Sequence, residues 1–83
     1  MNGNKLNRYQ QRMVEVLKTP SELRLEEFNA IVGSYGYKMV HAVGSHLKYK
    51  APGGPPLLIA VHHNKVGRFC VRRIFKSLLK STL

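Results

Sequence analysis

Three segments of the chain place apolar residues at the spacing of an α-helix. In the first, which covers about residues 4–18, the apolar positions are Leu6, Tyr9, Met13 and Leu17. In the second, which ends before a glycine at position 36, they are Phe28, Ile31, Val32 and Tyr35. In the third, over about residues 68–80, they are Val71, Ile74, Phe75, Leu78 and Leu79. Because residues three and four apart share one side of a helix, each segment predicts a helix with one buried stripe.

Between the second and third helices the pattern changes to that of short strands. The segments YKMVHAV (37–43) and HLKYK (46–50) carry β-branched and aromatic residues or alternate polar with apolar positions. LLIAVH (57–62) is a short apolar run typical of a buried strand. A Gly-Ser pair at 44–45 has the length of a hairpin turn, and APGGPP (51–56) makes a wider connection. The pattern predicts a two-layer α+β domain, in which the second and third helices cover one face of a three-stranded sheet.

The second predicted strand places a histidine and two lysines on one face. Side chains alternate across a strand, so Leu47 and Tyr49 share one face. His46, Lys48 and Lys50 then share the other. With Leu47 and Tyr49 directed toward the helices, we expect the imidazole and both ammonium groups to line up on the open face of the sheet.

The other three histidines also lie in or beside predicted strands. His41 falls on the same strand face as Tyr37 and Met39, and we expect a structural role for it. The third strand, with alternate apolar residues directed inward, turns His62 to the open face. His62 and His63 are adjacent and point to opposite faces, so they do not readily share one metal ion. With one cysteine and four acids in the chain, we expect neither a metal site nor another cofactor.

The net charge of the chain indicates what kind of partner it binds. The 83 residues, enough for one small domain, include 14 Lys and Arg against 4 acids, a formal net charge of +10. Such an excess repels itself and indicates a polyanionic partner, with nucleic acid first and an anionic membrane surface second. Solubility alone is the simpler alternative. The last predicted helix contains no acid, and its row of Arg72, Lys76 and Lys80 favours contact with phosphate or with an acidic protein.

The remaining composition favours a cytoplasmic protein. Cys70 is the only cysteine, so an intrachain disulfide is impossible, which suits a reducing compartment. Its neighbours are apolar, and we expect a small, buried side chain. No apolar run approaches the roughly 18 residues of a membrane-spanning helix, and the first residues lack the apolar core of a secretory signal.

His46 is the best candidate for chemistry. A histidine has an ordinary pKa of about 6.5, so it gives or takes a proton near neutral pH. Beside a phosphodiester, it can deprotonate an RNA 2′-hydroxyl or protonate the leaving oxygen, while Lys48 and Lys50 stabilise charge on the phosphate. This scheme requires no metal. Without further context, a lone strand histidine more often contacts phosphate or solvent, and the Gly-Ser pair before it is ordinary turn chemistry.

The stretches YGYKMVHAVGSHLKYKAPGG and VHHNKVGRFCVRRIFKSLL resemble the HicA (YcfA-like) family of toxin–antitoxin toxins. The shared features are a helix that ends in Gly-aromatic, the segment Gly44-Ser45-His46, and an aromatic residue before a Pro/Gly turn. A strand that ends in His-Asn and leads to a basic terminal helix completes the pattern. The resemblance covers about residues 21–81. The chain departs from many relatives at Leu47, where they carry a histidine or polar residue, and in KVGRFC (65–70).

This resemblance implies a fold like that of the double-stranded-RNA-binding domain, over residues 21–83, preceded by a helical extension over 1–20. It implies an endoribonuclease that cleaves messenger RNA, with the active-site histidine at His46. It also implies a HicB-type antitoxin partner that covers His46.

The leading hypothesis is therefore a metal-independent endoribonuclease toxin with His46 as general acid or base. Two roles are expected around it, a structural turn at Gly44 and RNA contacts at Ser45, Lys48, Lys50, Lys65, Arg68 and Arg72. One alternative is a non-catalytic RNA-binding module, in which the same residues contact only phosphate and the 2′-hydroxyl. Another is a toxin-like protein that retains only antitoxin binding.

Overall fold

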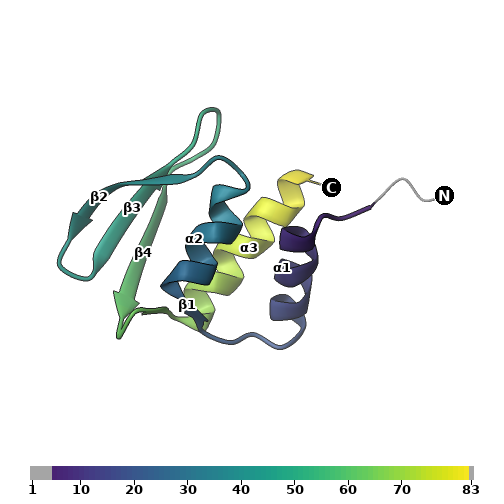
Figure 1. Cartoon of the computed structure of the whole chain (residues 1–83), viewed down its shortest axis with the longest axis horizontal. Coiled ribbons are helices and arrows are strands. Elements are labelled where there is room, and N and C mark those ends of the chain that lie inside the picture. Colours follow the sequence, from purple (N-terminus) through teal and green to yellow (C-terminus); the bar gives the residue numbers. More distant parts are fainter. Residues whose placement is uncertain (1–4, 83) are drawn as a thin grey trace.

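The computed structural model describes residues 5–82, and residues 1–4 and 83 of the predicted extension and domain lie outside this range. Its helices are α1 (Arg8–Lys18), α2 (Leu25–Gly33) and α3 (Arg68–Thr82). Its strands are β1 (Leu23–Arg24), β2 (Lys38–Val43), β3 (His46–Lys50), β4 (Leu57–His62) and β5 (Lys65–Val66) (Figure 1). The three predicted helices and the three predicted strands are all present, and the predicted α+β class is confirmed.

The first helix begins later than its apolar pattern predicts, because Asn7 caps it. The Asn7 side chain accepts a hydrogen bond from the backbone N–H of Gln10 at 2.8 Å. The Gln10 side chain in turn accepts one from the backbone N–H of Asn7 at 2.9 Å. This reciprocal capping box satisfies two N–H groups at the helix start. Met13 and Val16 then provide the buried side of α1.

The strands form one antiparallel sheet in the order β1-β5-β4-β3-β2. β1 and β5 have two residues each and pair through Leu23 opposite Val66. The sequence does not predict β5, since two residues are too few for a pattern of alternation. β2 lies at the other edge of the sheet, and its side chains are exposed along its whole length.

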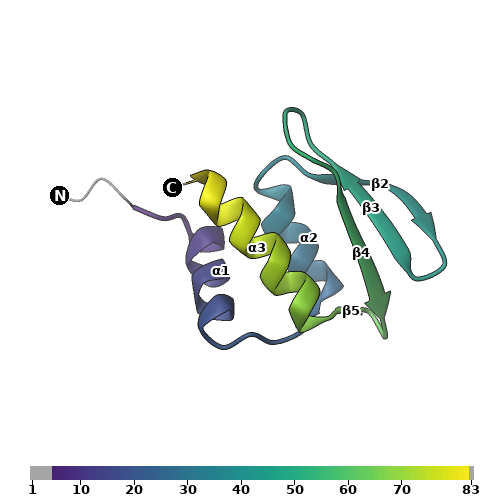
Figure 2. The ribbon, with the colours of Figure 1, turned by 180° about the vertical axis from the view of Figure 1, so that it is seen from behind.

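The helices and the sheet form two main layers. α2 and α3 cover one face of the sheet, and α1 packs on the side of these helices away from the strands (Figures 1 and 2). Phe28 of α2 lies at the centre of the core, with ring centroids 5.8 Å from Tyr49 and 6.1 Å from Phe75. Tyr49 of β3 therefore faces the helices, and the opposite face of the sheet, called the open face below, is uncovered. No helix among residues 5–82 has the length and apolar character needed to cross a membrane.

Two tight turns fix the strand register. Gly44 has φ 58° in the β2–β3 hairpin, and Ser45 has negative φ, the pattern of a type II′ turn. His63 and Asn64 both have positive φ, 53° and 62°, which is the pattern of a type I′ turn between β4 and β5.

The second turn also contacts α2, because the Asn64 side chain donates a hydrogen bond to Glu26 Oε2 at 3.1 Å. The backbone N–H of Glu26 and this amide hold the pKa of the Glu26 carboxyl below its ordinary value.

Candidate functional site

The open face carries the side chains that the alternation in β3 predicts. Tyr49 is 1% exposed and Leu47 is partly buried against the helices, whereas His46 and Lys50 are exposed and Lys48 is half-buried. The predicted orientation of His46, Lys48 and Lys50 is therefore confirmed. One imidazole and two ammonium groups lie in a row on the uncovered side of the sheet.

β4 lies beside this row and adds an apolar surface to it. Ala60 lies opposite His46, and Leu58 lies opposite Lys48, so both share the open face. Leu58 is 63% exposed, although it is a large apolar side chain. His62, two residues beyond Ala60, is exposed at the end of the strand, as predicted.

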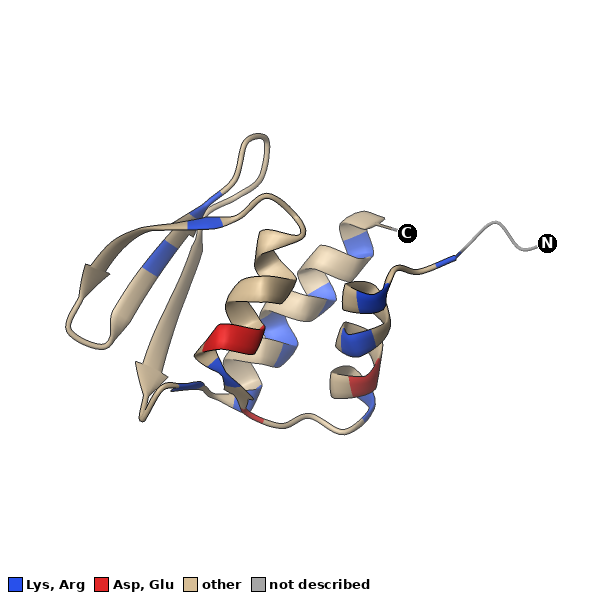
Figure 3. Ribbon diagram, in the orientation of Figure 1, with Lys and Arg blue, Asp and Glu red and all other residues tan. Residues whose placement is uncertain are grey.

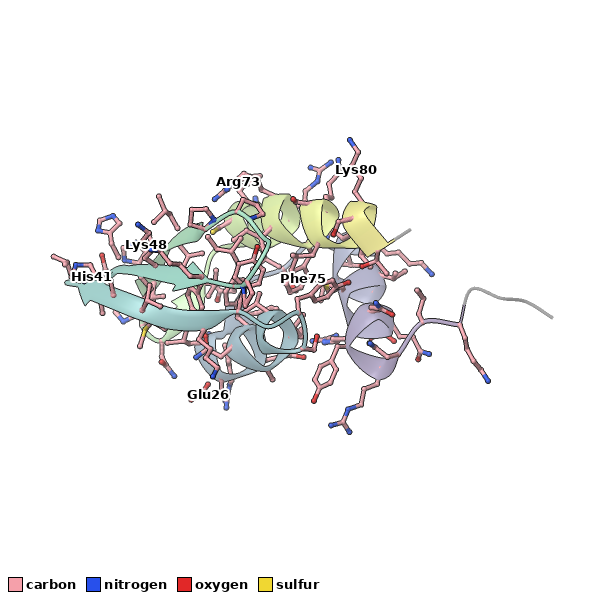
Figure 4. The ribbon with its side chains drawn as sticks, turned by 90° about the horizontal axis from the view of Figure 1, so that it is seen from above. Glu26, His41, Lys48, Arg73, Phe75 and Lys80 are labelled. Atoms are coloured by element: carbon pink, nitrogen blue, oxygen red, sulfur yellow. The ribbon has the colours of Figure 1, made fainter. Side chains whose placement is uncertain are left out.

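The prediction that His41 shares a strand face with Tyr37 and Met39 is wrong. Met39 lies opposite Tyr49, but the next pair along the ladder is His41 opposite Lys48, so Val40 is an extra residue in β2. Such a bulge shifts the alternation of the strand by one position and redirects the side chains that follow. Met39 stays on the helix side of the sheet, and His41 turns to the open face. Figure 4 shows His41 and Lys48 side by side on the neighbouring strands.

His41, His46 and Lys48 line one shallow hollow of about 380 Å³ on the open face. Its other lining residues are Val43, Leu47, Leu58, Ile59 and Ala60. The floor is therefore apolar, with two imidazoles and one ammonium group around it. A surface of this kind offers contact to a ribose or base and places cations beside a phosphate.

Ser45 and Gly44 hold the hairpin that positions His46. The Ser45 carbonyl accepts a hydrogen bond from the Val61 N–H at 2.7 Å, which ties the turn to β4. Gly44 adopts the left-handed backbone conformation that glycine tolerates without strain. The structure gives Ser45 a clear backbone role in this turn, and its predicted contact with RNA stays a prediction.

Lys65 is bound differently from the other predicted RNA contacts. It lies opposite His62 in the ladder, at the β5 end of the sheet. Its ammonium group lies 3.3 Å from Glu22 Oε1, with both side chains about half exposed. An exposed ion pair of this kind contributes at most about 1 kcal/mol, so a phosphate can compete with Glu22 for Lys65.

Arg68 and Arg72 lie on α3 and do not line the hollow. With Arg73, Lys76 and Lys80 they form an exposed basic surface, called the basic side of α3 below. The Arg68 guanidinium lies 5.0 Å from the centre of the Phe69 ring, and Phe69 is 73% exposed. Among residues 5–82, the ion pairs join α1 to itself and to α2, and β5 to the segment before β1, and none includes a residue of α3.

Arg73 connects the basic side of α3 to the sheet. β4 pairs with β5 only at Val61 and His62. At the earlier, unpaired part of this edge, the Arg73 guanidinium approaches the Leu58 carbonyl at 3.5 Å. It also lies 3.7 Å from the Cys70 sulfur. Cys70 is half-buried and not fully buried as predicted, and burial raises the pKa of its thiol. Arg73 is outside the predicted basic row, because that row at four-residue spacing contains its neighbour Arg72. Phe69 was missed because it resembles a core position.

The acids are confined to one part of the molecule and the cations are not. The acids lie on α1, on the α1–α2 connection and on α2, whereas Lys and Arg occur on α1 and also extend along the strands and α3 (Figure 3). In Figure 4, Lys48, Arg73 and Lys80 follow one side of the molecule, and Glu26 lies on the opposite side. A polyanion that contacts the open face therefore meets further cations at the edge of β4 and along α3.

Comparison with known proteins found no matching family model, no matching curated protein and no matching solved structure. Among residues 5–82, no three His, Cys, Asp or Glu side chains come together as a possible metal site. The open face is therefore the feature from which a function can be inferred.

Proposed function

We propose that the protein is a metal-independent endoribonuclease that acts as a HicA-type toxin on messenger RNA. The observation that carries this proposal is the position of His46, exposed on the open face beside Lys48 and above an apolar floor. The order α2, three main antiparallel strands, α3, with both helices on one face of the sheet, also supports a fold like the double-stranded-RNA-binding domain.

The chemistry requires an RNA 2′-hydroxyl and one group that transfers protons. The 2′-oxygen attacks the adjacent phosphorus, the bond from phosphorus to the 5′-oxygen breaks, and the products end in a 2′,3′-cyclic phosphate and a 5′-hydroxyl. His46 takes the proton from the 2′-hydroxyl or gives one to the 5′-oxygen. Lys48 and Lys50 stabilise the negative charge that grows on the phosphate oxygens. The nucleophile belongs to the substrate, so the scheme uses no metal-bound water.

The other cations bind the RNA on either side of the cut. Lys65 lies at the β5 end of the sheet, and Arg68 and Arg72 lie on α3, where they contact flanking phosphates. Phe69, exposed beside Arg68, offers an aromatic ring on which an unpaired base can stack. A HicB-type antitoxin is the proposed protein partner. It would cover His46 and bury the exposed side chains of Val43 and Leu58.

Cleavage of end-labelled RNA by the purified protein in EDTA tests this function. We expect cleavage to persist in EDTA and the new 3′ ends to be 2′,3′-cyclic phosphates. Binding of RNA without cleavage would instead support a non-catalytic RNA-binding module. If the protein neither binds nor cuts RNA, the proposal fails and antitoxin binding alone remains.

The salt dependence of RNA binding tests the role of α3. Each phosphate contact on a single strand contributes about 0.7 to the slope of log K against log salt concentration. We expect the double substitution Arg68→Ser and Arg72→Ser to reduce the slope by about 1.4, measured by fluorescence anisotropy with labelled single-stranded RNA. The matched control, Arg8→Ser with Lys18→Ser on α1, removes the same charge. Equal slopes in both variants would show that net charge, not contact with α3, drives binding.

A further inference from the structure

We propose that His41 is the second proton-transfer group of the site and that it acts with His46 as an acid–base pair across β2 and β3. This inference rests on the proposed ribonuclease function and assigns a residue to it. The bulge at Val40 carries it, because the extra residue turns His41 from the helix side of β2 to the open face.

The strand register places the two histidines close together. His41 lies opposite Lys48, and Val43 lies opposite His46, so His41 and His46 are diagonal neighbours on one face. Diagonal neighbours on adjacent antiparallel strands are about 7–8 Å apart, and their Cβ atoms are somewhat closer. Both imidazoles line the same hollow, with Lys48 beside them. Since each imidazole acts on an oxygen about 3 Å away, the pair can hold a phosphodiester between its rings.

Such a pair completes the proton balance of the cleavage step. The neutral imidazole accepts the proton of the 2′-hydroxyl as the 2′-oxygen forms its bond to phosphorus. The protonated imidazole gives its proton to the 5′-oxygen as the bond from phosphorus to that oxygen breaks. Lys48 lies opposite His41 and two residues from His46, where it can contact a non-bridging oxygen. One proton enters the pair and one leaves it, so no metal or other reactant is needed.

The surroundings leave both imidazoles free for this role. Hydrogen bonds among residues 5–82 include neither histidine side chain. Lys48 is the charged group that lines the hollow with the pair. The other charged or titratable groups of the surrounding elements are Lys38 and Lys50 on β2 and β3, His62 and Lys65 at the far end of β4 and on β5, and Arg73 of α3 at the Leu58 carbonyl. The four acids all lie between residues 15 and 27, outside β2, β3 and β4. No carboxylate of these strands therefore fixes one histidine as acid or base, and the bound phosphate is the anion that orients them.

A pH profile of cleavage tests the pair. Single-turnover rates on one RNA are measured between about pH 5 and pH 9, for the wild type, His41→Gln and the control His62→Gln. His62 shares the open face but does not line the hollow. We expect a bell-shaped profile for the wild type and for His62→Gln, because one imidazole must be neutral and the other protonated. His41→Gln should lose one side of the bell and at least about 10²-fold in rate.

An RNA with sulfur in place of the 5′-bridging oxygen identifies the acid, because a thiolate leaves without a proton. We expect this substrate to restore cleavage in one of the two variants His41→Gln and His46→Gln, and not in the other. A full bell and a wild-type rate in His41→Gln would overturn the inference while leaving the ribonuclease function intact. Rescue of both variants or of neither would also overturn it. If the wild type does not cut RNA, the proposed function itself fails. Thermal unfolding of each variant confirms that it is folded.

Discussion

If the proposed function holds, we expect the substitution His46→Gln to slow RNA cleavage by roughly 10²–10⁴-fold, the usual contribution of one general acid or base. Glutamine keeps a polar side chain of similar reach but has no group that titrates near neutral pH. His46 is exposed and begins β3 directly after the hairpin turn, so the substitution leaves the core untouched. The measurement is the single-turnover rate with a labelled RNA at saturating protein.

Controls for RNA binding and for folding show whether the loss of cleavage comes from the chemical step alone. We expect His46→Gln to bind the same RNA with the affinity of the wild type and to unfold at the same temperature, because neither property depends on the imidazole. His63→Gln is unsuitable as the histidine control, since His63 has φ 53° in a turn where a glutamine is strained. His62→Gln is the matched control. If His46→Gln cleaves at the wild-type rate, His46 contacts RNA without taking part in the chemistry.

The substitution Phe28→Ala is expected to lower the free energy of unfolding by about 3–5 kcal/mol. Phe28 is completely buried and packs against Tyr49 of the sheet and Phe75 of α3, so its loss leaves a cavity where the two layers meet. Domains of this size are stable by only about 5–15 kcal/mol, and a large share of that stability would be removed. Urea unfolding followed by circular dichroism measures the change.

Phe69→Ala is the matched control for the core substitution. It removes the same ring from a position that is 73% exposed, and we expect a change in unfolding free energy within about 0.5 kcal/mol. RNA binding should report the opposite ranking, since Phe69 lies on the basic side of α3. Equal destabilisation by the two substitutions would contradict the central position of Phe28 in the core.

Most of the fold could be predicted because it follows from regular patterns. The stripes of α2 and α3 and the alternation in β3 each extend over enough residues to indicate an element and its buried side. The start of α1 was not predicted, because the apolar pattern continues to Leu6, before the cap at Asn7. β5 could not be predicted, because a strand of two residues is defined by its pairing with β1 and β4 and not by a pattern of its own.

The candidate site was predictable on β3 and not on β2. His46, Lys48 and Lys50 follow strict alternation from the buried Tyr49, so one inward residue determines their face. In β2 the same argument assigned His41 to the wrong face, because it assumes that each residue has one partner and Val40 has none. The ion pair of Lys65 with Glu22 joins segments that are far apart along the chain, and only the folded structure brings them together.

The extra residue in β2 also affects the self-association of the protein through this edge strand. An exposed edge strand presents a row of backbone N–H and C=O groups with which a strand of a second chain can pair. Met39 and Val40, at 52% and 53% exposed, add apolar surface to this edge and favour such pairing. A bulge interrupts the even spacing of that row and bends the strand, so two such edges do not match along their length. The same insertion that brings His41 to the open face thus works against aggregation along β2.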